Sequence, residues 1–236
     1  MSRNVLRAGV LAAGLAVMSA SAARADSPNL RLLGPLGQTF IASSNSIDVS
    51  FLYSKAGHNN DLYIFIAAGN PGTKIFSVIG AYPAPSTVPP VGSSGTFAVT
   101  AGSEVLFGIC SRGGGVPNCA TDPIFYSGPG SRNSDGQPHV VSLTPAGWES
   151  VRPSSGSIAA LSGSVVFGFE DLPIGRGADL KTGKGCAPSD CDYNDVVFSV
   201  RGVTTTPEPV SMTLLATGLV GMGGAGLRRR KQNKNG

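Results

Sequence analysis

The stretch Ile47-Asp48-Val49-Ser50-Phe51-Leu52-Tyr53 decides the fold. Successive side chains of an extended strand point to opposite faces, so the four odd-numbered residues of this stretch are predicted to share one face. Seven further short runs of this kind are predicted to be strands: 62–67, 74–79, 96–100, 105–110, 140–143, 164–170 and 195–201. No run of ten residues within 26–206 has clear helical periodicity. We therefore predict an all-β fold, an antiparallel β-sandwich with Greek-key or jelly-roll-like connections.

The composition supports this fold class. The chain has 236 residues, of which 33 are Gly and 17 are Pro, and only 14% are charged. This low charge and high turn-former content disfavour coiled coils and long helical bundles. The hydrophobic share of 41% is too high for a disordered chain.

Residues 1–25 have the pattern of a secretory signal peptide. Arg3 and Arg7 give a positive start, an apolar stretch follows, and Ala23-Arg24-Ala25 is a small-x-small cleavage site. We predict a signal helix here, and an exported domain over residues 26–202.

The C-terminal part of the chain has three segments in order. A Thr/Pro linker at 203–209 ends in Pro207-Glu208-Pro209, an uncharged stretch covers 210–227, and a basic tail covers 228–236. Eighteen helical residues span about 27 Å, enough for a transmembrane helix, and the basic tail is predicted to stay in the cytoplasm.

This order of segments resembles the PEP-CTERM sorting signal of Gram-negative bacteria. The resemblance implies an exosortase-type sorting enzyme as partner, with transient membrane anchoring. The exported domain would first face the periplasm from the inner membrane. It would then reach the cell surface or an exopolysaccharide matrix.

The charge distribution argues against a nucleic-acid partner. The net charge of +4 is misleading, because eight of the 18 Lys and Arg residues lie in 1–25 and 207–236. Thirteen of the 14 acids lie in 26–206, which therefore carries a net charge of −3. The exported part is mildly acidic, so no nucleic acid is expected.

Four cysteines in an exported chain are expected to form disulfides. They permit three pairings, of which we favour the local pairs Cys110–Cys119 and Cys186–Cys191, because each pair flanks a turn-rich segment. Zinc is the alternative, but the spacing is not C-x-x-C and no histidine is near in sequence.

Acidic residues gather in two segments of the exported domain. Glu170 and Asp171 follow a predicted strand, and Asp190, Asp192 and Asn194 alternate just before Asp195. The D-x-D-x-N spacing can turn successive oxygens toward a hard cation in a curled loop, so these six residues are candidate calcium ligands. The two segments would converge if the strand ending at Glu170 pairs with the strand beginning at Asp195.

An EF-hand and an Asx-turn cluster are the two alternatives to this calcium site. The segment is not an EF-hand, because Asp195 occupies the position of the loop's central Gly and Arg201 that of its bidentate Glu. An Asx-turn cluster, in which Asp and Asn side chains bind their own backbone, is the other reading. Four acids and an Asn would crowd like charges in such a cluster, which favours a cation.

The pair of motifs Phe169-Glu170-Asp171-Leu172 and Asp190-x-Asp192-Tyr-Asn-Asp-Val-Val-Phe198 resembles a domain of unknown function, number 4114, of secreted bacterial proteins. The resemblance covers about 140–201. It implies a β-rich extracellular domain with a calcium site at the six residues named above. The Cys186/Cys191 pair is not part of the family pattern.

These features predict a non-enzymatic surface or extracellular-matrix protein with a calcium-stabilised β-domain, associated with exopolysaccharide or biofilm. Acids crowded in one loop suit metal ligation better than glycoside hydrolysis, which needs two carboxyl groups at set distances. No G-x-S-x-G motif occurs. The alternatives are a carbohydrate-binding module, with Trp148 or surface tyrosines as stacking residues, and a polysaccharide hydrolase. An anionic exopolysaccharide is the expected ligand.

Overall fold

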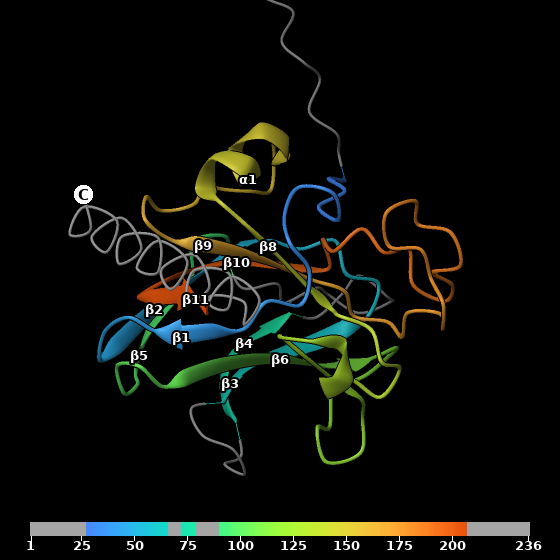
Figure 1. Ribbon diagram of the computed structural model, residues 1–236, viewed down its shortest axis with the longest axis horizontal. Helices are drawn as coiled ribbons and strands as arrows, with labels where there is room; N and C mark the ends of the chain where they lie inside the picture. Colours follow the sequence, from blue (N-terminus) through green and yellow to red (C-terminus); the bar gives the residue numbers. More distant parts are fainter. Residues whose placement is uncertain (1–26, 66–71, 79–89, 207–236) are drawn as a thin grey trace, which may run out of the picture.

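A computed structural model describes residues 27–65, 72–78 and 90–206 (Figure 1). The predicted signal helix (1–25), PEP motif, transmembrane helix (210–227) and basic tail (228–236) lie outside the described residues. Within the described ranges, no helix has both the length and the apolar character needed to cross a bilayer.

The described chain is predominantly β, as predicted, and forms two antiparallel sheets. The first has the order β5 (Ser94–Ala98), β2 (Ser46–Tyr53), β10 (Val196–Arg201), β9 (Val165–Phe169) and β8 (Val140–Leu143). The second has the order β11 (Val203–Thr205), β1 (Phe40–Ala42), β6 (Glu104–Arg112), β3 (Asn59–Phe65) and β4 (Thr73–Val78), with β7 (Ile124–Tyr126) also paired to β6.

The two sheets pack face to face through a phenylalanine-rich core. The ring of Phe107 on β6 lies 5.2 Å from that of Phe167 on β9 and 5.3 Å from that of Phe198 on β10. Phe40 on β1 contacts Phe167 edge-on at 4.6 Å. Alternating apolar residues on these strands thus bury one face of each sheet, which accounts for the sandwich.

A second apolar cluster covers the outer face of the first sheet. It is built around Trp148 of the short helix α1 (Pro145–Val151), which begins at Thr144 and packs above β8 and β9 (Figure 1). The Thr144 hydroxyl accepts a hydrogen bond from the Gly147 N–H, which caps the helix. This sheet is therefore covered on both faces over β8 and β9, whereas alternate residues of the edge strand β5 are exposed.

The prediction for Tyr53 is wrong. Ile47, Val49 and Phe51 lie in the inter-sheet core, as expected, but Tyr53 lies in the second cluster. The pairing register between β2 and β10 shifts between Val197 and Phe198. This β-bulge inserts one extra residue and turns the end of β2 to the other face.

Two segments expected outside strands lie within the second sheet. Val203–Thr205, at the start of the expected 203–209 linker, forms β11 and pairs with β1. Asn59 and Asn60, expected in a loop, belong to β3. The sheet therefore extends past residue 202.

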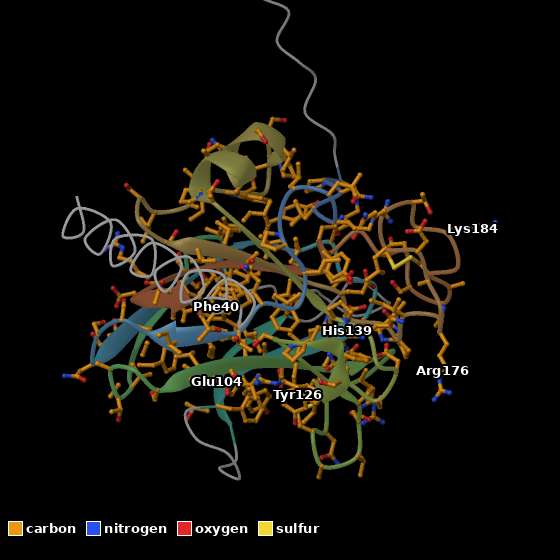
Figure 2. The ribbon with its side chains drawn as sticks, in the orientation of Figure 1. Phe40, Glu104, Tyr126, His139, Arg176 and Lys184 are labelled. Atoms are coloured by element: carbon orange, nitrogen blue, oxygen red, sulfur yellow. A yellow bond between two sulfur atoms is a disulfide. The ribbon has the colours of Figure 1, made fainter. Side chains whose placement is uncertain are left out.

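Both predicted disulfides are confirmed. Cys110 is bonded to Cys119 and Cys186 to Cys191, with Cα–Cα distances of 5.5 and 5.9 Å. Figure 2 draws the side chains of the whole fold, with disulfide bonds in yellow.

Candidate metal centre

The ends of β9 and β10 bring the two acidic segments together. Phe169, the last residue of β9, pairs with Val196, the first of β10, and the Asp195 N–H donates to the Phe169 carbonyl at 3.1 Å. The Asp171 N–H donates to Asp195 Oδ2 at 2.9 Å. The predicted convergence of the two segments is confirmed.

The loop before β10 has an unusual backbone conformation. Cys191 and Tyr193 have φ values of 57° and 60°, in the left-handed region that non-glycine residues rarely adopt. The Cys186–Cys191 disulfide closes the loop, and the buried Tyr193 hydroxyl donates to the Pro138 carbonyl at 2.8 Å. A Cβ atom at Gly168 would collide with the Tyr193 carbonyl, so Gly168 lets the loop lie against β9. These contacts hold the strained conformation in place.

The N-terminal segment covers this loop on one side. The Leu30 N–H donates to the Asp192 carbonyl at 2.7 Å, and Asn194 Nδ2 donates to the Pro28 carbonyl at 2.7 Å. The amide nitrogen of Asn194 is therefore used within the protein, which leaves its Oδ1 as the atom available to a cation.

The hydrogen bonds of an Asx-turn cluster are also present. The Asp192 N–H donates to Asp190 Oδ1 at 3.3 Å, and the Asn194 N–H donates to Asp192 Oδ1 at 3.1 Å. These turns curl the loop so that alternate side chains point to the same side. The turns do not exclude a cation, since each carboxylate oxygen has two lone pairs.

All six predicted residues line one cavity of about 340 Å³, together with Lys55, Ser27 and a few neighbours. Their carboxylates form two groups in which the ligand oxygens all lie within 4.8 Å of one another. One group contains Glu170, Asp190 and Asp192, and the other contains Glu170, Asp171 and Asp195. Glu170 is common to both.

The acids of this cavity are unusually buried. Glu170 is 1% exposed, Asp171 2% and Asp195 8%. Burial, and then the charges of neighbouring acids, raises the pKa of Glu170 to about 8 and that of Asp195 to about 10. The pKa of Asp192 rises to about 6 for the same two reasons. Glu170 Oε2 is buried without a hydrogen-bond partner. When it is ionised, this side chain would therefore need a cation or a hydrogen-bond donor beside Oε2.

Three residues that contact this site were not predicted as site residues. Asn60 Nδ2, on β3 of the opposite sheet, donates to Asp171 Oδ2 at 2.7 Å. Burial raises the pKa of Asp171, while hydrogen bonds from Asn60 and the His58 backbone act against that rise. Lys55, just after β2, lines the cavity. These residues lie far in sequence from the acidic motifs, so no local sequence pattern marked them as part of the site.

His139 contacts the backbone of the site at Glu170. This buried side chain, labelled in Figure 2, has Nδ1 3.0 Å from the Glu170 carbonyl and Nε2 2.8 Å from Asp135 Oδ2. Its ring stacks on Phe125 at 4.0 Å. His139 therefore fixes the backbone of Glu170 and is not exposed to a substrate.

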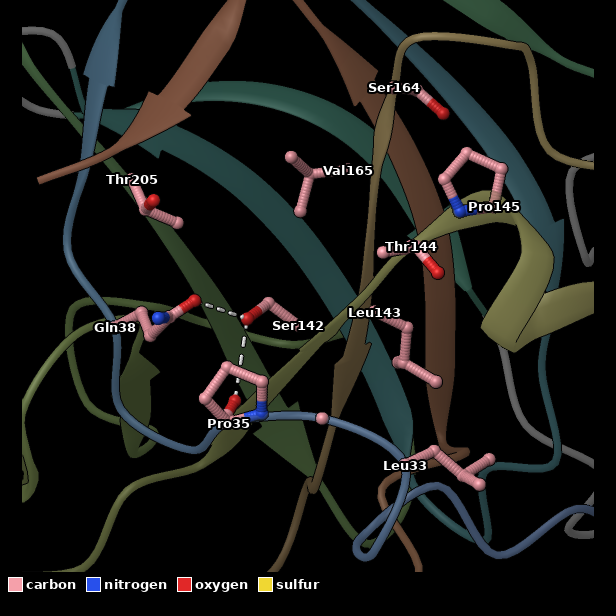
Figure 3. Close-up of a pocket in the computed structure, with 11 residues that line it drawn as sticks. Leu33, Pro35, Gln38, Ser142, Leu143, Thr144, Pro145, Ser164, Val165 and Thr205 are labelled. Atoms are coloured by element: carbon pink, nitrogen blue, oxygen red, sulfur yellow. Dashed lines mark hydrogen bonds between the residues drawn. The ribbon is translucent and has the colours of Figure 1, made fainter.

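A second pocket, of about 310 Å³, offers no comparable chemistry (Figure 3). It is lined mainly by apolar side chains such as Leu33, Leu143 and Val165, and none of its described lining residues is titratable. Ser142 Oγ lies 2.8 Å from Gln38 Oε1 and 3.3 Å from the Pro35 carbonyl, so its polar groups bond to one another. The acidic cavity is the stronger candidate site.

The sequence comparisons place the site within a known family pattern. Residues 100–203 match the family model described as "Domain of unknown function (DUF4114)". The DUF4114 match confirms that part of the expected resemblance and extends it toward the N-terminus. It contains all six candidate ligands and both disulfides. No curated protein and no solved structure matches the chain.

Proposed function

We propose that this chain is an exported, non-enzymatic surface or matrix protein whose β-sandwich is stabilised by calcium in the acidic cavity. The observation that carries the proposal is Glu170. Its side chain is buried, has an oxygen without a hydrogen-bond partner, and belongs to both carboxylate groups.

The donor set fits calcium better than other metals. Both groups consist of carboxylates, and the side chain of Asn194 also lines the cavity. Calcium accepts six to eight oxygen ligands in irregular geometry, whereas zinc favours Cys and His. Bound calcium would neutralise the carboxylates and join the ends of β9 and β10 to the preceding loop.

A structural role is favoured over hydrolysis. A catalytic carboxyl group must reach its substrate, but Glu170, Asp171 and Asp195 are almost fully buried. His139 is also buried and engaged at both ring nitrogens. The cavity therefore favours ion binding, in which every oxygen stays ionised.

Export and sorting are proposed from the sequence pattern. The signal-peptide pattern at 1–25 and the PEP-CTERM pattern at 207–231 favour processing by an exosortase and delivery to the surface or an exopolysaccharide matrix. The two disulfides support an oxidising destination.

Carbohydrate binding remains a second candidate, through surface tyrosines and not through Trp148. Trp148 is fully buried and its Nε1 donates to the Ile158 carbonyl at 2.9 Å, so it cannot stack on a sugar. Instead, Tyr63, Phe65 and Tyr126 form a row of half-buried rings, with centroids 6.2 and 5.4 Å apart. We expect Tyr126→Ala to weaken glycan binding if this row binds sugar, and an unchanged glycan array would contradict it.

The calcium proposal is tested by metal content and thermal unfolding of the purified full chain. A ligand that binds only the folded state at 100 times its dissociation constant stabilises it by about 2.7 kcal/mol. We expect calcium to raise the melting temperature after EDTA treatment, with magnesium much less effective because it demands octahedral geometry. Equal melts with and without calcium, and no bound metal by mass spectrometry, would refute the proposal.

A further inference from the structure

The five carboxylates of the cavity form two overlapping groups rather than a single one. Calcium–oxygen distances are about 2.3–2.6 Å, so two oxygens on one ion lie within about 5 Å of each other. Each three-residue group meets this limit by itself. Among the described residues, however, Asp190 and Asp192 do not join Asp171 and Asp195 in a single group.

Glu170 links the two groups through one side chain. It is 1% exposed, lines the cavity and has a carboxylate oxygen without a hydrogen-bond partner. A carboxylate has two oxygens, so it can contact one cation through each of them. The unpartnered oxygen is an independent sign that a positively charged group belongs beside Glu170.

The charge of the cavity also favours two cations. Five carboxylates line it, and among its described lining residues Lys55 alone is cationic. With all five carboxylates ionised, one divalent ion would leave three negative charges in a cavity where Glu170, Asp171 and Asp195 are buried. Two ions would leave a single negative charge. Uncompensated charge of this kind is costly when buried.

We propose that the cavity is a two-calcium centre bridged by Glu170, which rests on the proposed function above. The inner ion is held by Glu170, Asp171 and Asp195, and the outer ion by Glu170, Asp190 and Asp192. The inner ligands are all buried, whereas Asp190 is exposed and Asp192 half-buried. The outer ion therefore keeps more water ligands and binds more weakly.

The test is the stoichiometry of calcium binding to the purified full chain, measured by isothermal titration with calcium chloride and by metal analysis. We expect two calcium ions per chain with distinct affinities. Asp190→Asn, a change at an exposed position, is expected to weaken the second ion by about tenfold or more while the first ion stays bound. Glu104→Gln, at an exposed acid on β6, is the control and should bind two ions.

The outcomes separate the two proposals. One ion per native chain, with a titration unchanged in Asp190→Asn, would overturn the two-ion centre and leave calcium binding standing. No bound calcium at all would overturn both. Two ions whose affinities fall equally in Asp190→Asn and Glu104→Gln would overturn the assignment of the outer ligands.

Discussion

Replacing Glu170 by Gln should change the stability of the protein in opposite directions with and without calcium. The substitution keeps the shape of the side chain but removes its charge. Without metal, the buried carboxyl group of Glu170 destabilises the folded state, because its ionised form has no counter-charge. In the proposed calcium centre, the same group is the ligand shared by both carboxylate groups. Gln should therefore stabilise the metal-free chain and abolish most of the stabilisation by calcium.

The magnitude for the metal-free chain follows from the pKa of Glu170. This pKa rises from its ordinary value of 4.5 to about 8 on folding. Each unit corresponds to 1.36 kcal/mol, so keeping the group protonated at pH 7 costs about 3 kcal/mol. Part of this cost arises from repulsion by neighbouring acids, which are still present in the variant. We therefore expect Glu170→Gln to gain about 1–3 kcal/mol, which is roughly 2–12 °C for a domain of this size.

The assay is thermal unfolding of the full chain at pH 7, in EDTA and in saturating calcium. Glu104→Gln is the matched control. The same chemical change at this exposed residue should alter the free energy of unfolding by less than about 1 kcal/mol, both in EDTA and in calcium. A Glu170→Gln chain that is less stable in EDTA than the native chain would refute the electrostatic reasoning. An undiminished calcium shift in this variant would refute the role of Glu170 as a ligand.

Three further predictions test the loop, the titration and the core. Replacing both Cys186 and Cys191 by Ser should lower the free energy of unfolding in urea by about 2 kcal/mol and raise the calcium concentration needed for half-saturation. The same change at Cys110 and Cys119 should cost about 3 kcal/mol and leave that calcium concentration unchanged. Equal half-saturation concentrations in the two variants would contradict a role of the Cys186–Cys191 disulfide in the site. In EDTA, the free energy of unfolding should fall as the pH rises from about 4 to 8, because the raised pKa values of Glu170 and Asp192 make the folded chain bind more protons than the unfolded chain. Calcium should remove this fall. A free energy of unfolding that rises with pH in EDTA would contradict these pKa shifts. Trp148→Phe should lower the free energy of thermal unfolding by about 1–2 kcal/mol, because the hydrogen bond to the Ile158 carbonyl is lost. Glycan binding should stay unchanged. A variant that keeps its stability but loses glycan binding would contradict the buried position of Trp148.

The sequence pattern predicted the long strands and missed the short ones. β2, β6 and β10 contain enough alternating residues to reveal their buried face. β1, β7 and β11 have three residues each, too few for any period to be visible, and they exist because neighbouring strands supply their hydrogen bonds. The bulge opposite Tyr53 is likewise a property of the strand pair and not of either strand alone.

The acidic site was predictable for a different reason. Its ligand candidates come from two short segments, and the pairing of β9 with β10 follows from the apolar runs beside them. The supporting residues were not predictable, because each depends on a contact between distant parts of the chain. Asn60 reaches Asp171 across 111 positions from the opposite sheet, and His139 reaches the Glu170 carbonyl across 31.

The strain and the charge of the loop lead to the same physical conclusion. Left-handed backbone at Cys191 and Tyr193 and buried carboxylates at Glu170 and Asp195 each oppose folding. A disulfide offsets the first cost, but the one cationic residue among the described residues that line the cavity, Lys55, is exposed and forms no ion pair with the buried acids. Extracellular calcium modules commonly bind in the range of about 0.1–1 mM. If the outer ion has an affinity in that range, the loop reaches full stability only where calcium is abundant, and export would then complete the folding of the site.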